Sequence, residues 1–176
     1  MAARNPTGKA KNHGARKAGK RKASTRKVKP VPDGYHSITP YLIIDGAAAA
    51  LEFYKRAFGA KEKVRMPHGE RIAHAEILIG DSHVMLADEH PQMGYRAPAA
   101  GNMPPVGILL YVKDVDAVFA RAVAAGARVD RPLADQFYGD RTGSIIDPFG
   151  HRWYLATHIE DVSPQEMKRR MQTDMQ

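Results

Sequence analysis

The sequence predicts an α+β domain built by internal duplication. A strand–helix–strands pattern occurs twice, which is typical of a repeated structural unit. Three pairs of residues mark the repeat at offsets of 67 to 69 positions: Asp45 and Asp114, Gly59 and Gly126, Leu86 and Leu155. A break in charge near Pro30 separates a basic N-terminal segment from the body of the chain. The body, roughly 146 residues, has the length of one domain with a sizeable core.

The first copy should begin with a strand over residues 38–44. Pro40 has no N–H to donate, so this strand is expected at a sheet edge or at a bulge. A helix should follow and end before Gly59, because its apolar residues recur at helical spacing. Alternating apolar and polar residues then predict strands over residues 71–79 and 83–88, joined by a turn at residues 80–82.

The second copy repeats this order. A strand over residues 106–112 precedes a helix with Asp114 as its N-cap. Short strands over residues 144–146 and 151–157 flank a type I turn at residues 147–150. Residues 89–105 between the copies are rich in Pro and Gly, which predicts a long loop that serves as a lid or a linker. Ser163 begins a capping box for a last helix that runs towards Met171.

The basic N-terminal tail is assigned to residues 1–33. Residues 1–30 hold eleven of the 27 Lys and Arg and none of the 19 Asp and Glu, which leaves 16 basic against 19 acidic residues in the rest. This segment has almost nothing to bury and should be disordered. It could be a solvated arm, or it could contact nucleic acid phosphates without sequence preference. A transit peptide is disfavoured because the segment lacks Leu, Ile and Phe.

Several classes of protein are excluded or disfavoured by composition. The chain has no Cys, which excludes disulfides, thiolate metal sites and a Cys nucleophile and fits a reducing compartment. No apolar run approaches the ~20 residues of a membrane span, and no apolar segment follows the basic N-terminus as in a secretory signal. We therefore expect a cytoplasmic protein with no membrane partner.

The duplicated unit resembles the vicinal oxygen chelate superfamily, which includes glyoxalase I, extradiol dioxygenases and bleomycin-resistance proteins, and within it the PhnB-like group. The segments that carry the resemblance are residues 38–42, 50–54, 79–89, 112–117, 138–141 and 147–153. The resemblance implies two βαβββ modules, about 36–90 and 106–158, within a domain at 34–160. It also implies curved mixed sheets around a central cavity and a homodimer. Residues 161–176 would form a C-terminal helix or tail.

The superfamily's chemistry usually needs a divalent metal held by His, Gln or Glu on the first and last strand of each module. The resemblance places these four positions at Thr39, Met85, Gly107 and Tyr154. None is a ligand of the expected type. We therefore expect no metal at this site and no other cofactor, although a divalent metal elsewhere is left open.

His74 and Glu76 are the candidate catalytic residues. They stand two apart in an alternating strand and so share one face of the sheet, together with Ile72 and Leu78. Such a pair could act in acid–base catalysis or supply two metal ligands. It could also line a cavity, or simply form the solvated face of the sheet.

The candidate ligand-binding residues are Tyr41, Phe137, Tyr138, Arg141 and Tyr154. The segment 136–141 combines aromatic residues with one cation that could pair with an anionic ligand. Alternatively, Arg141 could pair with its neighbour Asp140. Trp153 and Tyr154 should lie on opposite faces of one strand, and the resemblance places Tyr154 in the cavity. The ligand is expected between this loop, the His74/Glu76 face and Tyr154.

The residues leave three functions open. The missing metal ligands favour a protein that binds a small molecule, one that could carry an anionic group, without chemistry. A lyase- or isomerase-like enzyme that uses acid–base chemistry or an unusual metal is the second possibility. The third is a protein that associates with polyanions through its basic tail, with the folded body serving to dimerise it.

Overall fold

The computed structural model describes residues 28–99 and 101–174. The chain divides into two units, Met1–Pro30 and Val31–Gln176, and every helix and strand described below belongs to the second. The predicted disorder and nucleic acid contact of the tail fall almost wholly on residues 1–27, outside the described residues. No helix of the described segments is long and apolar enough to cross a membrane.

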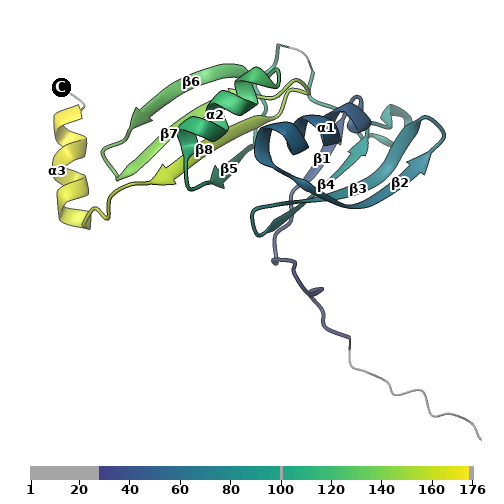
Figure 1. Ribbon diagram of the computed structural model, residues 1–176, viewed down its shortest axis with the longest axis horizontal. Helices are drawn as coiled ribbons and strands as arrows, with labels where there is room; N and C mark the ends of the chain where they lie inside the picture. Colours follow the sequence, from purple (N-terminus) through teal and green to yellow (C-terminus); the bar gives the residue numbers. More distant parts are fainter. Residues whose placement is uncertain (1–27, 100, 175–176) are drawn as a thin grey trace, which may run out of the picture. The chain divides into compact units, whose positions relative to one another are not determined.

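The first module contains one helix and a four-stranded sheet (Figure 1). Its elements in chain order are β1 (Tyr41–Ile44), α1 (Ala47–Phe58), β2 (Lys61–His68), β3 (Arg71–Ile79) and β4 (Ser82–Asp88). The strand order across the sheet is β1-β4-β3-β2, with β1 parallel to β4 and the other pairs antiparallel. As Pro40 predicts, β1 is an edge strand, but it begins at Tyr41 rather than Ile38.

The second module has the same topology, which confirms the internal duplication. Its elements are β5 (Gly107–Tyr111), α2 (Val115–Ala124), β6 (Arg128–Asp135), β7 (Asp140–Ile146) and β8 (Arg152–His158). The sheet order is β5-β8-β7-β6, again with one parallel pair, β5 and β8. The predicted α+β class with two βαβββ modules is therefore confirmed, and the two sheets are separate and do not close onto each other.

Two strands have no counterpart in the strand patterns predicted from the residues. β2 and β6 lie at the outer edge of each sheet, and nearly all their side chains are exposed or half-buried, so they lack a buried apolar alternation. β7 begins at Asp140, four residues before the predicted strand, and therefore includes part of the expected 136–141 loop.

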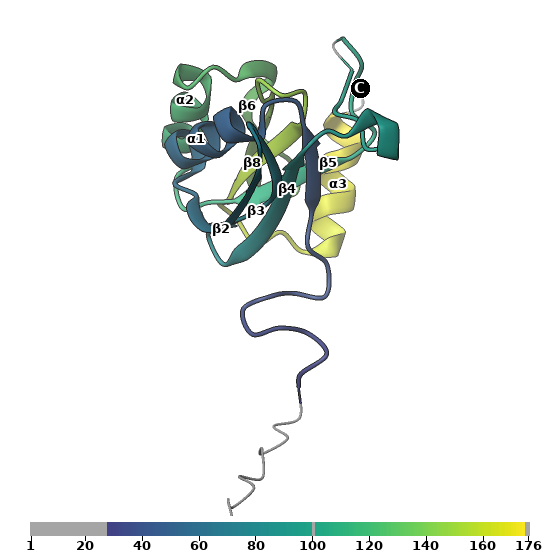
Figure 2. The same cartoon turned by 90° about the vertical axis from the view of Figure 1, so that its right-hand side faces the viewer.

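The helices α1 and α2 pack against each other and lie on the same side of the strands (Figure 2). Asp114 caps α2 as predicted, because its Oδ1 accepts the Ala117 N–H at 2.9 Å. Gly59 ends α1 in the left-handed conformation, φ +66°. The last helix, α3 (Pro164–Asp174), begins with Ser163 accepting the Glu166 N–H, as the capping box predicts.

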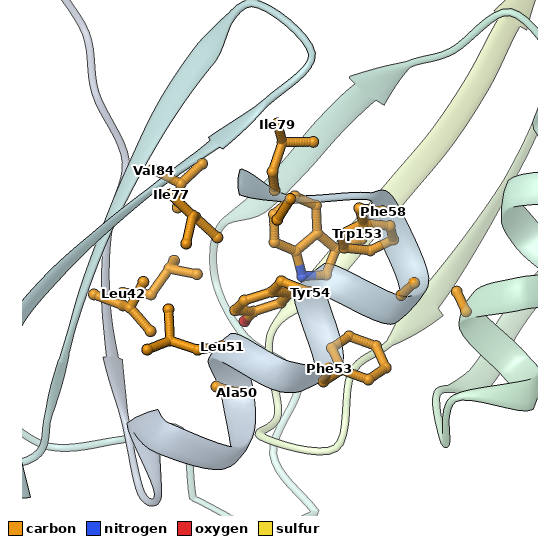
Figure 3. Close-up of a cluster of buried hydrophobic side chains, with 14 of the residues drawn as sticks. Leu42, Ala50, Leu51, Phe53, Tyr54, Phe58, Ile77, Ile79, Val84 and Trp153 are labelled. Atoms are coloured by element: carbon orange, nitrogen blue, oxygen red, sulfur yellow. The ribbon is translucent and has the colours of Figure 1, made fainter. Parts of the chain in front are cut away.

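One apolar core joins the two modules. Figure 3 shows Tyr54 and Phe58 of α1 meeting Trp153 of β8, with ring centroids 5.5 Å and 4.7 Å from the indole. The buried Asp147 accepts hydrogen bonds from the Tyr54 hydroxyl at 2.7 Å and the Trp153 indole N–H at 3.0 Å. Its other oxygen accepts the N–H groups of Phe149 and His151. Asp147 therefore fixes the turn from which β8 starts.

Each sheet keeps one face away from this core, which we call its open face. The alternate residues of these strands are buried in the core or packed against it. The open face of the first module therefore carries Tyr41, His74, Glu76 and Met85, and that of the second carries Leu109, Tyr111, Arg152 and Tyr154. Trp153 and Tyr154 thus lie on opposite faces, as predicted. Ile72 does not share a face with His74. A register shift in the pairing of β2 and β3 turns it into the core.

Candidate ligand-binding site

A cavity with a volume of about 970 Å³ lies beside the first strand of each module. Its walls are β1, the beginning of β5, residues His151 and Arg152, and the segments 96–99 and 102–106 of the loop between β4 and β5. The loop packs closely on the turn before β8: a Cβ atom on Gly150 would lie 2.9 Å from the Pro98 Cβ. Gly150 therefore makes this approach possible, and the long loop forms one side of the cavity.

The lining of this cavity is mainly apolar with a few polar groups. Ile38, Ile43, Pro98, Met103 and Val106 are among its apolar residues. The polar side chains come from Tyr41, Arg96, Asn102, His151 and Arg152. Among the described residues that line the cavity, none is Asp or Glu. The cavity thus combines apolar area with a cationic rather than an anionic set of side chains.

Arg152 stands at the start of β8 with its side chain 16% exposed. Its Nε lies 3.3 Å from Asp130 Oδ2, close enough for an ion pair, but the alignment is poor and this buried nitrogen has no hydrogen-bond partner in the described part of the chain. Nη2 donates to the Met103 thioether sulfur at 3.0 Å, and Nη1 donates to the Tyr154 hydroxyl at a long 3.4 Å. Ser144 donates to Asp130 at 2.8 Å and so holds its carboxylate.

Tyr154 occupies the region where the resemblance places a metal. A Cβ atom on Gly107 would lie 2.5 Å from Cε2 of the Tyr154 ring, so the ring covers the space of a side chain on β5. The four implied metal positions thus hold Thr39, Met85, Gly107 and a Tyr ring. Within residues 28–99 and 101–174, no group of three or more His, Asp or Glu is arranged to hold a metal ion. The absence of a metal remains a prediction.

Tyr41, His74 and Glu76 form a hydrogen-bonded chain on the open face of the first module. The Tyr41 hydroxyl lies 2.9 Å from His74 Nδ1, and His74 Nε2 lies 3.1 Å from Glu76 Oε1. Tyr35 donates its hydroxyl to the other Glu76 oxygen and stacks on His83 with ring centroids 4.0 Å apart. The structure therefore brings three predicted site residues together, and Tyr41 extends the chain into the cavity lining.

Tyr41 and Glu76, the two outer groups of this hydrogen-bonded series, keep their ordinary charge states. The hydrogen bond from Tyr35, with a second from His74, lowers the pKa of Glu76. Burial is the main cause that raises the pKa of Tyr41. At neutral pH, Glu76 is thus a carboxylate that can only accept, and Tyr41 keeps its proton. When the imidazole is neutral, His74 Nε2 donates to Glu76 and Nδ1 accepts from Tyr41.

The other predicted binding residues lie elsewhere. Tyr138 and Tyr154 share a smaller pocket of about 280 Å³ with Tyr111 and Asp140 on the open face of the second module. Phe137 lines a groove beside α3. The residues of the single predicted site therefore do not line one pocket. Tyr41, Tyr154 and Phe137 line three different pockets, and His74 and Glu76 line none of these three.

Arg141 points away from both pockets. It lies between Asp140 and Thr142 on β7. Both of these neighbours line the Tyr154 pocket, whereas Arg141 does not. Its guanidinium donates two hydrogen bonds to Asp116 of α2, at 2.8 Å and 2.7 Å, and a third to Asp135 at 2.9 Å. These carboxylates raise the pKa of Arg141, and neither is Asp140, the partner considered from sequence. Its donors are committed to structural ion pairs.

Sequence reasoning missed most of the residues that line the cavity, including Arg152 and Met103. Arg152 shares strand parity with Tyr154, and this signal could have placed it on the same open face. Met103 belongs to the loop predicted as a lid or a linker, but no local pattern links it to Arg152, 49 residues away. The structure therefore substitutes Arg152 for Arg141 as the cation that faces a cavity.

Comparison with known proteins establishes the family. The model of the Glyoxalase/Bleomycin resistance protein/Dioxygenase superfamily matches residues 34–155. The uncharacterized protein Rv0887c of Mycobacterium tuberculosis is 42% identical over 139 residues, which cover 77% of this chain and 82% of the relative. The chain therefore belongs to the glyoxalase/bleomycin resistance protein/dioxygenase superfamily, as the resemblance implies.

Solved structures agree with this assignment. The crystal structure of TioX from Micromonospora sp. ML1 is 30% identical and superposes with a TM-score of 0.55, covering 69% of this chain and 98% of TioX. A PhnB protein from Bacillus cereus, described as a putative 3-demethylubiquinone-9 3-methyltransferase, is 19% identical with a TM-score of 0.55, over 69% of this chain and 99% of that one. At that identity the second likeness concerns the fold alone.

Proposed function

We propose that this protein binds a small molecule in the 970 Å³ cavity beside the loop between β4 and β5. The observation that carries the proposal is the cavity itself, whose volume and mainly apolar lining with a few polar groups are typical of small-molecule sites. Tyr41 and Arg152 approach it from the two modules, so a ligand could contact both halves of the duplicated fold.

Acid–base catalysis is a second candidate, because the Tyr41 hydroxyl in the cavity lining is hydrogen-bonded to His74. The charge states of Glu76 and Tyr41 favour ligand binding over acid–base catalysis. A general base works best with a pKa near the operating pH, whereas hydrogen bonds lower the pKa of Glu76. Tyr41, with its raised pKa, serves better as a fixed hydrogen-bond donor to a ligand.

A neutral fluorescent probe of apolar cavities, N-phenyl-1-naphthylamine, tests the binding proposal. The wild-type protein should bind it saturably. Val106→Trp should weaken binding at least tenfold, because the indole would fill part of the cavity that Val106 lines. Val129→Trp, at an exposed position of β6 outside the cavity, is the matched control and should bind normally. Equal binding by the two Trp variants would refute this location.

We also propose that the protein forms a homodimer through the open faces of its sheets. Support comes from the apolar side chains exposed there: Tyr41 is 48%, Leu109 52% and Tyr111 56% exposed. Sedimentation should give about twice the mass of one chain for the wild type and for the control Val123→Glu on α2. Leu109→Glu should sediment as a single chain, and a dimeric Leu109→Glu would exclude this face.

Polyanion association through residues 1–30 remains a separate proposal, supported by their eleven basic residues. Weak binding to nucleic acid that falls steeply with salt, and that is lost when these residues are removed, would support it. A cytoplasmic location is likewise a proposal, supported by the absence of Cys from the sequence.

A further inference from the structure

We infer that the ligand of this cavity carries an anionic group, such as a carboxylate, phosphate or sulfonate, and that Arg152 holds it. This inference rests on the proposed function, since it names the chemical class that the same cavity would take. It places the anion at the end of the cavity where β8 begins and the apolar body of the ligand between β1 and the loop.

The charge of the cavity wall supports an anion. Arg96, His151 and Arg152 contribute basic side chains to the lining, and no carboxylate from residues 28–99 or 101–174 lines it. Asp130, whose Oδ2 lies 3.3 Å from Arg152 Nε, belongs to β6 and is not part of this lining. Because charges interact more strongly where water is excluded, a cationic wall favours an anionic ligand over a neutral one of the same shape.

The hydrogen bonding of Arg152 leaves capacity for such a ligand. A guanidinium has five N–H donors in a rigid fork, which matches the geometry of a carboxylate or phosphate. Here Nη2 donates to a thioether, a weak acceptor, and the Nη1 bond to Tyr154 is long. An anionic oxygen that replaces the Met103 sulfur would exchange a weak hydrogen bond for a charge-assisted one.

The surroundings of Arg152 hold it in place for this role. Asp130 Oδ2 lies 3.3 Å from Arg152 Nε and accepts a hydrogen bond from the Ser144 hydroxyl. The guanidinium carbon of Arg152 lies over the Tyr154 ring, 6.0 Å from its centroid. Holding a cation in its bound position before the ligand arrives reduces the entropy lost on binding. Met103 lies on the loop, so the group that the ligand displaces belongs to the segment that borders the cavity.

A matched pair of fluorescent probes tests the inference. The anionic probe is 8-anilinonaphthalene-1-sulfonate, and the neutral probe is N-phenyl-1-naphthylamine, which has the same ring system without the sulfonate. Both are titrated into the full-length wild type and into Arg152→Gln. The double variant Arg152→Gln with Asp130→Asn is included so that no half-buried carboxylate is left unpaired. Arg141→Gln, which removes a cation remote from the cavity, is the control.

The wild type and Arg141→Gln should bind the sulfonate at least about tenfold more tightly than the neutral probe, the scale of a charge-assisted hydrogen bond. Both Arg152 variants should lose this preference while binding the neutral probe within twofold of wild type. The basic residues of the tail are common to all variants. A difference in sulfonate preference between the wild type and the Arg152 variants therefore reports on Arg152. A preference that persists in the double variant, or none in wild type, would overturn the inference and leave neutral binding intact. If neither probe binds, the proposed function itself fails.

Discussion

The ring of Tyr154 occupies the space that a side chain at Gly107 would need, since a Cβ atom at Gly107 would lie 2.5 Å from Tyr154 Cε2. The two residues lie on the parallel strands β5 and β8, at positions where relatives of this fold are expected to hold metal ligands. Here they form an aromatic surface beside the guanidinium of Arg152. The open face of the second module is thus shaped by packing between a ring and a glycine.

This relationship predicts that Gly107→Ala destabilises the protein by about 1–3 kcal/mol, because the new methyl group and the Tyr154 ring cannot both keep their places. Urea unfolding of Gly107→Ala, Tyr154→Ala and the double variant forms the test. In the Tyr154→Ala background, Gly107→Ala should lower the free energy of unfolding much less than it does in the wild type. If the two effects simply add, Gly107 and Tyr154 are not coupled.

A second prediction concerns the buried carboxylate that joins the modules. Asp147→Ala should cost more than about 3 kcal/mol, since it leaves the Tyr54 hydroxyl, the Trp153 indole N–H and two backbone N–H groups without an acceptor. Tyr54→Phe removes only one donor and should cost about 1–3 kcal/mol. Both are measured by urea denaturation. A loss below 1 kcal/mol for Asp147→Ala would contradict the role given to this residue.

A third prediction concerns pH and the Tyr35–Glu76 hydrogen bond. Because this bond is the largest cause that lowers the folded-state pKa of Glu76, Glu76 stabilises the fold above the unfolded carboxyl pKa. That contribution should be lost as pH falls through the lower folded value. Tyr35→Phe should move the Glu76 pKa upward, as read from its carboxyl carbon by NMR. An unchanged pKa in Tyr35→Phe would show that Tyr35 is not its cause.

The fold could largely be predicted because its central elements carry strong local patterns. The helix over residues 47–58 and the strands around Ile77 and Leu86 show the periodicity of elements with one buried face. The outer strands β2 and β6 could not be predicted in this way, because their side chains face water on both sides and the pairing partner determines their conformation.

The candidate site was harder to predict than the fold. The opposite orientations of Trp153 and Tyr154 follow from strand alternation and were predicted correctly. Which cation faces a cavity depends on contacts distant in sequence: Arg141 is held by Asp116, 25 residues away, and Arg152 meets Met103 across 49 residues. Such pairings leave no local signal in a single sequence.

Backbone NMR shows whether a small molecule binds between β1, β5 and the loop between β4 and β5. Titration with N-phenyl-1-naphthylamine should shift the amide signals of Tyr41, Ile43, Val106, Gly107 and Ile108, which line the 970 Å³ cavity. The amides of Tyr111, Tyr138 and Thr142, in the separate pocket of the second module, should move little. Shifts confined to that second pocket, or no saturable shifts at all, would exclude binding in this cavity.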